Sequence, residues 1–423
     1  MNVRLAYGQG HLTVDFPADR TTVIEPAHVP GLRDEREAVI AGLEQPIGAR
    51  PLSEWVRPDS RICIVFTDST RATPNERIIP WLLHFLITKA GASRDRIVLL
   101  NSVGTHRPNS KAELERLLTP EVVRDYQVIN HEPENPSALV QFGVTHDGTP
   151  ALLNRHLVNA DVRIITGFIE PHFFAGFSGG PKGIMPGCAG LQTVISNHGA
   201  KHIADPRSAF GITTGNPIWE EMRAIALRPG PSFLLNVTLN EAREITNVFA
   251  GDLIEAHRAG TEFVRRSAMQ RVKEPFEIVV TTNSGFPLDQ NLYQGVKGMS
   301  AGARILQEQG SLILACECRE GVPAGSPMDE FMRSTSGPDE ILARLATPGF
   351  VRPEQWQAQI QALIQRRARV QVFSALPPEV IRACHLTPCI DIGEAVRSRL
   401  SELGPNARVA VLPQGPLTIP YLA

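Results

Sequence analysis

Residues 62–66 read ICIVF, and after a polar turn a second segment runs from Pro74 to Lys89 with apolar residues three and four positions apart. Five consecutive apolar residues predict a buried strand, and the second spacing predicts a helix. Further apolar runs of strand length occupy residues 96–104, 163–167, 233–239, 276–283, 311–317, 370–376 and 408–413. Because strands that are apolar on both sides need cover on both faces, we predict an α/β fold with mainly parallel sheets covered by helices.

Length and charge narrow the class of protein further. The chain has 423 residues, enough for two or three domains. Its 42 Lys and Arg against 44 Asp and Glu leave a net charge of −2, which disfavours binding to nucleic acid or anionic lipid. No run approaches the roughly 18 apolar residues of a membrane-spanning helix, and the polar N-terminus is unlike a secretory signal. We therefore expect a cytoplasmic protein.

One segment suggests how the chain divides. Residues 265–275, RRSAMQRVKEP, are mostly polar, end in proline and precede a predicted strand. Such composition is typical of a linker. We therefore predict an N-terminal α/β domain over residues 1–273 and a C-terminal α/β domain over residues 274–423.

Polar residues follow four of the predicted strands. In open parallel sheets, ligands bind beyond the carboxyl ends of the strands. Any one of these turns has an ordinary explanation, since Asp, Ser, Thr and Asn favour turns and helix caps. Four such turns, with two histidines and two arginines among them, indicate a binding site. They are residues 67–71, 104–107, 170–172 and 283–285.

The segment of residues 167–190 contains seven glycines and three prolines, which predicts a shaped loop. Successive backbone N–H groups in such a loop can bind an anion, and Lys182 adds a charge or a nucleophilic amine. Pro181 and Gly183 flank this lysine, which is unlike the Gly-Lys-Ser/Thr sequence of an ATP-binding P-loop.

Two further pairs of residues can be interpreted either functionally or structurally. His198 and His202 lie four apart on a predicted helix, so one metal ion could bind both, although His202 is better explained as a packing or surface residue. Gln294 and Lys297 lie three apart at a predicted helix start, where both can reach one ligand or simply face solvent.

Several of these motifs together resemble the lactate racemase family. They are residues 167–187 (GFIEPHFFAGFSGGPKGIMPG), 68–71 (DSTR), 104–108 (GTHRP) and 287–299 (PLDQNLYQGVKGM). The likeness runs in order from about residue 60 to about residue 360. These enzymes use a nickel-pincer nucleotide, a pyridinium mononucleotide whose ring carbon and two sulfurs bind nickel.

The resemblance implies a role for each matching residue. Lys182 would bond covalently to the cofactor, and His198 alone, rather than with His202, would be the fourth nickel ligand. His106 and His172 would take and give the substrate hydroxyl proton while hydride moves between substrate C2 and the cofactor. The remaining positions implied near the cofactor are Asp68, Ser69, Thr70, Arg71 and Trp356. Those implied to bind substrate are Arg71, Tyr293, Gln294 and Lys297. The active site would lie in the interdomain cleft.

The resemblance leaves the substrate open. The family's lactate enzyme has arginine immediately before the attachment lysine, whereas this chain has Pro181. We expect a racemase of a short 2-hydroxy acid, lactate or malate. For a dicarboxylate, Arg107 is the candidate extra cation, unless it only holds its loop.

Two alternatives and the expected partners complete this interpretation. One alternative is an epimerase of a sugar acid such as an aldonate, and the other is a non-catalytic carrier of the cofactor, which would not need His106 and His172. Expected partners are the small 2-hydroxy acid and the cofactor-biosynthesis proteins, with a homo-oligomer possible and no nucleic acid or membrane.

Overall fold

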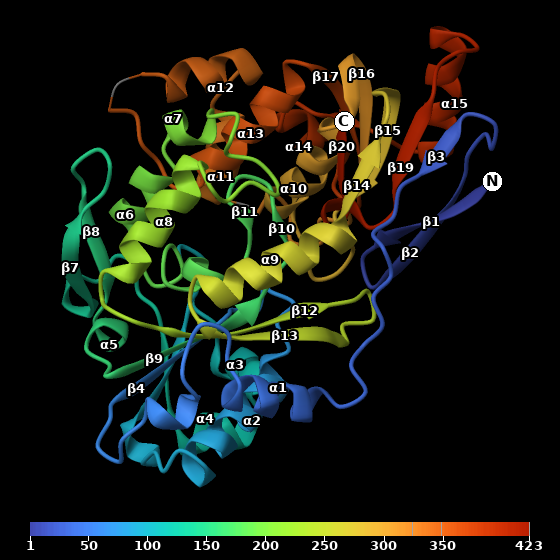
Figure 1. Cartoon of the computed structure of the whole chain (residues 1–423). Helices are drawn as coiled ribbons and strands as arrows, with labels where there is room; N and C mark the ends of the chain where they lie inside the picture. The colour runs from blue at the N-terminus through green and yellow to red at the C-terminus, as the bar shows by residue number, and fades with distance from the viewer. Residues whose placement is uncertain (324, 348, 423) are drawn as a thin grey trace.

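The computed structural model of the chain describes residues 1–423 except 324, 348 and 423, and it contains two six-stranded sheets (Figure 1). The first sheet has the strand order β13-β12-β9-β4-β5-β6. Only the β12–β13 pair is antiparallel. Its strands are β4 (Ile62–Phe66), β5 (Ile97–Asn101), β6 (Gln127–Asn130), β9 (Val162–Phe168), β12 (Phe233–Leu239) and β13 (Ile245–Asp252).

The second sheet is parallel throughout and has the order β18-β17-β16-β15-β19-β3. Its strands are β3 (Thr21–Val23), β15 (Phe276–Thr282), β16 (Leu306–Ala315), β17 (Ala368–Phe373), β18 (Thr387–Pro388) and β19 (Val409–Leu412). Every strand predicted from an apolar run is therefore present, and the predicted fold class is confirmed.

The other strands form pairs outside these sheets. They are β1 (Asn2–Tyr7) with β2 (Gly10–Asp15), β7 (Leu139–Val144) with β8 (Pro150–Asn154), β10 (Pro171–His172) with β11 (Gly176–Phe177), and β14 (Met269–Val272) with β20 (Ile419–Leu422). The 3₁₀ helices are η1 (Leu52–Glu54), η2 (Arg94–Arg96), η3 (Pro136–Ala138), η4 (Gly180–Gly183) and η5 (Gly415–Leu417).

Helices lie on both faces of each sheet (Figure 1). They are α1 (Glu35–Glu44), α2 (Asn75–Thr88), α3 (Lys111–Leu118), α4 (Pro120–Asp125), α5 (Arg155–Val158), α6 (Leu191–Asn197), α7 (Ala200–Ile203), α8 (Pro217–Leu227), α9 (Glu255–Ala268), α10 (Leu292–Ala303), α11 (Pro327–Arg333), α12 (Pro338–Leu345), α13 (Gln355–Gln365), α14 (Pro378–Ala383) and α15 (Ile392–Leu403).

Strand β4 shows why both faces need cover. Its alternate residues Ile62, Ile64 and Phe66 join one buried cluster with α1 and α2, while Cys63 and Val65 join another on the opposite face. Successive side chains of a strand point to opposite faces, so an unbroken apolar run requires two cores.

The structure changes the predicted division of the chain at its start. Strand β3 pairs with β19 of the second sheet, and Val3, Leu5 and Phe16 pack against Ile278 and Val280 (Figure 1). The first residues thus belong with the C-terminal unit, not with the domain of residues 1–273. Burial of these apolar side chains holds the N-terminal segment there, and local sequence patterns carry no signal of that long-range pairing.

The segment predicted as a linker is regular structure. Residues 265–268 end α9, and β14 follows directly at residues 269–272 and pairs with β20. Backbone hydrogen bonds between β14 and β20 therefore hold the segment that connects the two units. The domain boundary near residue 273 stays a prediction.

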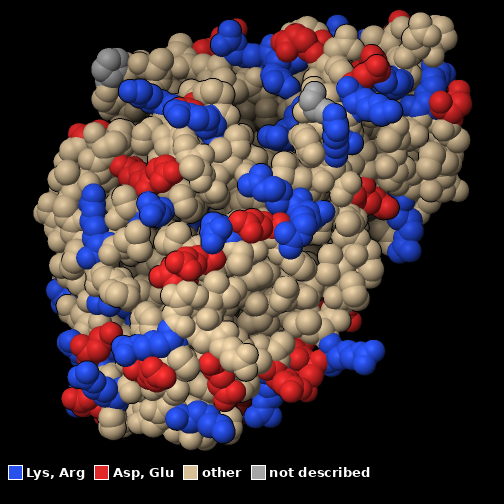
Figure 2. Space-filling model, in the orientation of Figure 1, with Lys and Arg blue, Asp and Glu red and all other residues tan. Residues whose placement is uncertain are grey.

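The helices and the surface charge of the molecule concern its possible binding partners. No helix among the described residues is both long and apolar enough to cross a membrane. On the face shown in Figure 2, Lys and Arg side chains alternate with Asp and Glu side chains. That face therefore lacks the broad positive field that draws in polyanions.

Candidate active site

A cavity that is accessible to solvent lies between the two units. The first unit contributes residues that follow the carboxyl ends of β4, β5 and β9, as the strand-end turns predicted. The second unit contributes residues of α10 and α13. Of the residues singled out by sequence, the cavity is lined by Arg71, His106, His172, Lys182, His198, Tyr293, Gln294, Lys297 and Trp356.

His106 is held at the cavity wall by Asp68. The Asp68 Oδ2 and His106 Nδ1 atoms lie 2.6 Å apart. Asp68 is buried, and although burial opposes its ionisation, the charges of His106 and Arg71 hold its pKa well below the usual value. An ionised Asp68 accepts the Nδ1 proton of His106, so Nε2 is the ring nitrogen that can exchange a proton with a ligand.

Asp68, Ser69 and Thr70, which are expected beside the cofactor, are not among the residues that line the cavity, and their contact with the cofactor stays a prediction. Asp68 instead supports His106 and accepts hydrogen bonds from the backbone N–H and hydroxyl of Thr70. Ser69 accepts a hydrogen bond from Asn109. The side chains of the turn after β4 therefore hydrogen-bond to one another and to the neighbouring residues His106 and Asn109. Sequence spacing alone could not predict these contacts.

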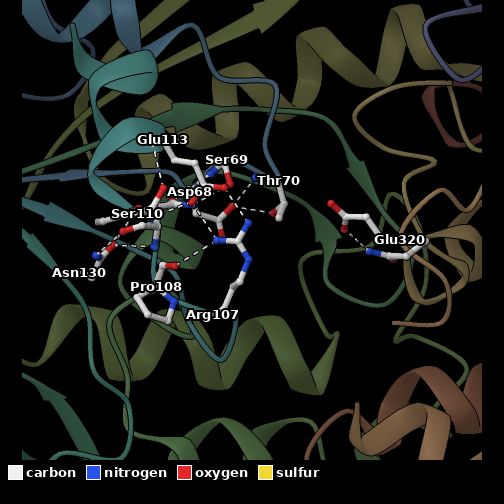
Figure 3. Close-up of polar contacts among 12 residues, drawn as sticks. Asp68, Ser69, Thr70, Arg107, Pro108, Ser110, Glu113, Asn130 and Glu320 are labelled. Atoms are coloured by element: carbon white, nitrogen blue, oxygen red, sulfur yellow. Dashed lines mark hydrogen bonds and ion pairs between the residues drawn. The ribbon is translucent and has the colours of Figure 1, made fainter. Parts of the chain in front are cut away.

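Arg107 is engaged away from the cavity. Its guanidinium donates to both carboxylate oxygens of Glu113, at 2.8 and 2.6 Å (Figure 3). Glu113 also accepts from the backbone N–H of Ser110 and forms the capping box of α3 with it. Of the two interpretations left open, the structure favours Arg107 holding its loop.

The loop that carries Lys182 is fixed by two buried polar residues. Asn236, in β12, accepts a hydrogen bond from the backbone N–H of Gly180 at 2.9 Å. The His257 Nε2 atom lies 2.9 Å from the carbonyl oxygen of Ser178. Gly180 has a φ of +55°, and a Cβ atom there would lie 2.4 Å from the His257 ring. Only glycine fits at this position.

Asn236 went unnoticed in the sequence, although a signal was present. The segment FLLNVTL, residues 233–239, has two polar residues, Asn236 and Thr238, and the amide of Asn236 is the more polar side chain. An amide inside an otherwise apolar strand needs a buried hydrogen-bond partner, and here that partner is the lysine loop.

The cavity concentrates positive charge. Burial lowers the pKa of Lys182 well below its usual value, and the neighbouring charges of Arg71 and Lys297 lower it further. Burial and Arg71 likewise lower the pKa of Lys297 to about 7. Burial raises the pKa of Glu170, an effect that the Lys297 and Arg71 charges oppose. Crowded buried cations favour the binding of anions, and a neutral lysine amine is nucleophilic.

His172 and His198 stand in one aromatic row with Phe174 and Trp356. Phe174 lies between the two imidazoles, with ring centroids 4.6 Å from His172 and 4.9 Å from His198. The Trp356 ring lies 5.0 Å from His198 on the other side. Burial lowers the pKa of both histidines well below the usual value, and the charge of Lys182 adds to this. Both rings are therefore neutral near pH 7.

His198 and His202 do not share a helix as predicted. α6 ends at Asn197, His198 caps it, and α7 starts after Gly199. The break turns His198 toward the cavity, whereas His202 stacks on His146 with ring centroids 3.9 Å apart. Gly199 in the sequence was the signal for this break, since glycine often ends helices.

Asn197 orients His198. Its side-chain Nδ2 donates to Glu221 Oε2 at 2.8 Å and to the Ile218 carbonyl at 3.2 Å. Because both of these partners only accept, the Oδ1 atom must face His198 Nδ1, 2.9 Å away. His198 therefore carries its proton on Nδ1, and Nε2 is free to bind a metal.

The second unit closes the cavity with an amide-rich wall. Trp356 Nε1 donates to the Tyr293 hydroxyl at 3.0 Å, and the Gln357 amide donates to the Tyr293 carbonyl. The Oε1 atoms of Gln294 and Gln357 are buried and have no hydrogen-bond partner among the residues that the structure describes. Buried polar atoms are normally satisfied, so these two favour a polar ligand in the cavity.

Comparisons with known proteins agree with this architecture. Family models described as the lactate racemase N-terminal and C-terminal domains match residues 7–211 and 272–419. A lactate racemase of Thermoanaerobacterium thermosaccharolyticum is 33% identical over 420 residues, which is 98% of each chain. The chain belongs to the lactate racemase family.

Other comparisons extend this result. A lactate racemase of Lactiplantibacillus plantarum is 34% identical over 384 residues, 90% of each chain. The structure of the lactate racemase apoprotein from Thermoanaerobacterium thermosaccharolyticum has a TM-score of 0.93 at 32% identity, covering 99% of this chain and 100% of that one. A crystal structure from Thermotoga maritima, 20% identical with a TM-score of 0.72, shares the fold.

Membership in the lactate racemase family makes the protein an isomerase of the racemase class, and this family uses a nickel cofactor. The cavity residues fit such a group. His198 offers a free imidazole nitrogen, Lys182 offers an amine, and Arg71 offers a positive charge. No cysteine lines the cavity among the described residues, so sulfur ligands would have to come from the cofactor.

Proposed function

We propose that this protein racemises a short 2-hydroxy acid with a nickel-pincer nucleotide bound covalently at Lys182 and through nickel at His198. The observation that supports this most is the meeting of Lys182, His198, His106 and His172 in one cavity. The chemistry that the cofactor supplies when bound is the reversible acceptance of hydride from C2 of the substrate. The chain's own residues bind the acid and move its hydroxyl proton.

Two cations would hold the substrate carboxylate. Arg71 comes from the first unit and Lys297 from the second, so the acid would bridge the units. The guanidinium of Arg71 can pair with two carboxylate oxygens. Fixing the carboxylate leaves the hydroxyl to face one histidine or the other, depending on the enantiomer.

The two histidines would exchange protons with that hydroxyl. His172 is buried and neutral, so it can accept a proton, and His106, whose Nδ1 is held by Asp68, is the partner that would give one from Nε2. Inversion at C2 would also need the reversible hydride acceptance that the cofactor supplies. The part of the two rings would be that one takes the hydroxyl proton and the other returns a proton to the oxygen when the mirror image forms. In the reverse reaction His106 and His172 would exchange these two roles.

The charge pattern favours a monocarboxylate such as lactate over malate. A second carboxylate would need a further cation, but Arg107 is committed to Glu113 and Pro181 carries no charge. A sugar acid would need hydrogen-bond partners for its further hydroxyls, which the Oε1 atoms of Gln294 and Gln357 could supply, so gluconate is tested alongside.

The test is to co-produce the full chain with the cofactor-building enzymes and to follow single enantiomers of lactate, malate and gluconate by optical rotation. We expect lactate to reach a racemic mixture, with malate slower by at least about tenfold, since one unpaired carboxylate costs 1.4 kcal/mol or more. Denaturing mass spectrometry should find an adduct on Lys182 that is missing from Lys182→Arg.

Three results would count against the proposal. An active protein with an unmodified Lys182 would refute the covalent attachment. Faster turnover of malate or gluconate than of lactate would reassign the substrate. An adduct with no turnover of any acid would favour the cofactor-carrier alternative.

A further inference from the structure

Three potential metal ligands meet outside the cavity, behind His198. His146 lies in the turn between β7 and β8, His202 on α7, and Glu221 on α8. One ligand atom from each lies within 4.8 Å of the others. The mechanism uses none of these side chains, and the sequence offers no local motif for them because they come from three separate segments.

The neighbouring hydrogen bonds orient two of the three side chains as metal sites do. His202 Nδ1 lies 3.1 Å from the Asn197 carbonyl oxygen, which places the ring proton on Nδ1 and leaves the Nε2 lone pair free. Glu221 Oε2 is held by the Asn197 side chain at 2.8 Å. Metal-ligating histidines commonly donate their other ring N–H to a carbonyl in this way.

The third ligand faces solvent. The His146 side chain is 37% exposed, and its Nδ1 lies 3.2 Å from Glu221 Oε1. This opening provides a path of entry for an ion and room for a water molecule. Two imidazoles and a carboxylate, with a fourth position for water, are a ligand set that suits Zn²⁺.

We propose that His146, His202 and Glu221 bind a divalent transition-metal ion of the zinc class, separate from the cavity between the units. Ligand atoms on a tetrahedral zinc lie about 3.3 Å apart for bonds near 2.05 Å, so these three close by about 1.5 Å at most around the ion. Glu221 is held by the Asn197 side chain and by the backbone N–H of His146, so rotation of the exposed His146 side chain would supply most of this movement.

The ion would also stiffen the support of His198. Asn197 donates to Glu221 through its side chain, faces His202 with its carbonyl and accepts from His198. A metal that fixes Glu221 and His202 therefore fixes Asn197 from two sides. The site would act as a structural clamp on the segment that carries His198.

The test is calorimetric titration of Zn²⁺ into the metal-stripped full chain, with Co²⁺ absorption as a probe of tetrahedral geometry. We expect one Zn²⁺ equivalent that is weakened at least about 100-fold in His146→Ala and in His202→Ala, since loss of even an outer-shell partner costs 10–100-fold. His84→Ala, an exposed histidine on α2, is the matched control and should bind like the unaltered chain.

The His198→Ala variant separates this site from the cavity and from the proposed racemase. Its Zn²⁺ equivalent should persist, because His198 is not a ligand here. Unchanged binding in both His146→Ala and His202→Ala, or loss of binding in His198→Ala alone, would overturn the proposal. Because binding rather than turnover is measured, a failed racemase assay would leave this result standing.

Discussion

The Oδ1 atom of Asn197 lies 2.9 Å from Nδ1 of His198 and can only accept the proton of that ring, because the Asn197 amide nitrogen is committed to Glu221 and Ile218. One buried amide thus decides which nitrogen of His198 faces the cavity as a free lone pair. Asn197 is fully buried, so no water competes for this hydrogen bond.

We therefore expect Asn197→Ala to lower nickel retention by about 10–100-fold and to lower kcat with it, as loss of an outer-shell partner generally does. The measurement is nickel content per chain after dialysis, together with kcat. Ser196→Ala is the matched control, since Ser196 bonds Thr145 instead of His198. Equal nickel content in the two variants would contradict an orienting role for Asn197.

Asp68→Asn should reduce kcat by about 10²-fold or more, because the neutral amide would not hold His106 in the same tautomer as the carboxylate does. Substrate binding through Arg71 should change little, so KM should stay within a few-fold. Steady-state kinetics in both directions provide the check, with Ser69→Ala alongside. A kcat near that of the unaltered enzyme would show that His106 works without its carboxylate.

The pH dependence of substrate binding should follow Lys297. Its pKa is lowered to about 7, so the ammonium form that attracts a carboxylate is present below pH 7 and is lost as the pH rises through that value. We expect KM for the 2-hydroxy acid to rise several-fold between pH 6 and pH 8.5. In Lys297→Arg the cation persists over this whole range, and KM should be nearly flat. The same rise in both proteins would assign the titration to another group.

Gly180→Ala should destabilise the protein more than Gly215→Ala. Both glycines have a positive φ, +55° and +81°, but a Cβ at 180 would meet the His257 ring at 2.4 Å while Gly215 has open space around it. The conformational cost alone is about 1 kcal/mol, and the overlap adds about 1–3 kcal/mol at Gly180.

Thermal denaturation of the two cofactor-free variants compares these costs directly, and mass spectrometry of protein made with the cofactor-building enzymes shows whether the Lys182 adduct forms. We expect the lower midpoint and the smaller adduct fraction in Gly180→Ala. Equal midpoints would mean that His257 moves aside at no cost.

Local patterns predicted the strands well because a short unbroken apolar run, in a chain of this composition, usually forms a buried strand. ICIVF at 62–66 and FEIVVTT at 276–282 are both central parallel strands, buried on both faces. The same patterns could not show that β3 joins the second sheet. This strand has only three residues, and its partner β19 lies almost at the other end of the chain.

For the site, residue types and order were enough to select Lys182, His106, His172 and His198, and all four line the cavity. Their supporting partners escaped prediction. Asp68 was expected beside the cofactor but supports His106, and Asn197 and Asn236 drew no attention, because a supporting hydrogen bond depends on two segments folding against each other.

The sequence by itself determined the strands and helices, the loop that carries Lys182 and the types of side chain available to the chemistry, since these follow from local spacing and composition. Tertiary structure alone decided which side chains meet. It turned His198 inward at the break after α6, committed Arg107 to Glu113, and gathered His146, His202 and Glu221 from three segments. Hydrogen bonds and charge effects act over a few ångströms, and only folding brings distant segments within that range.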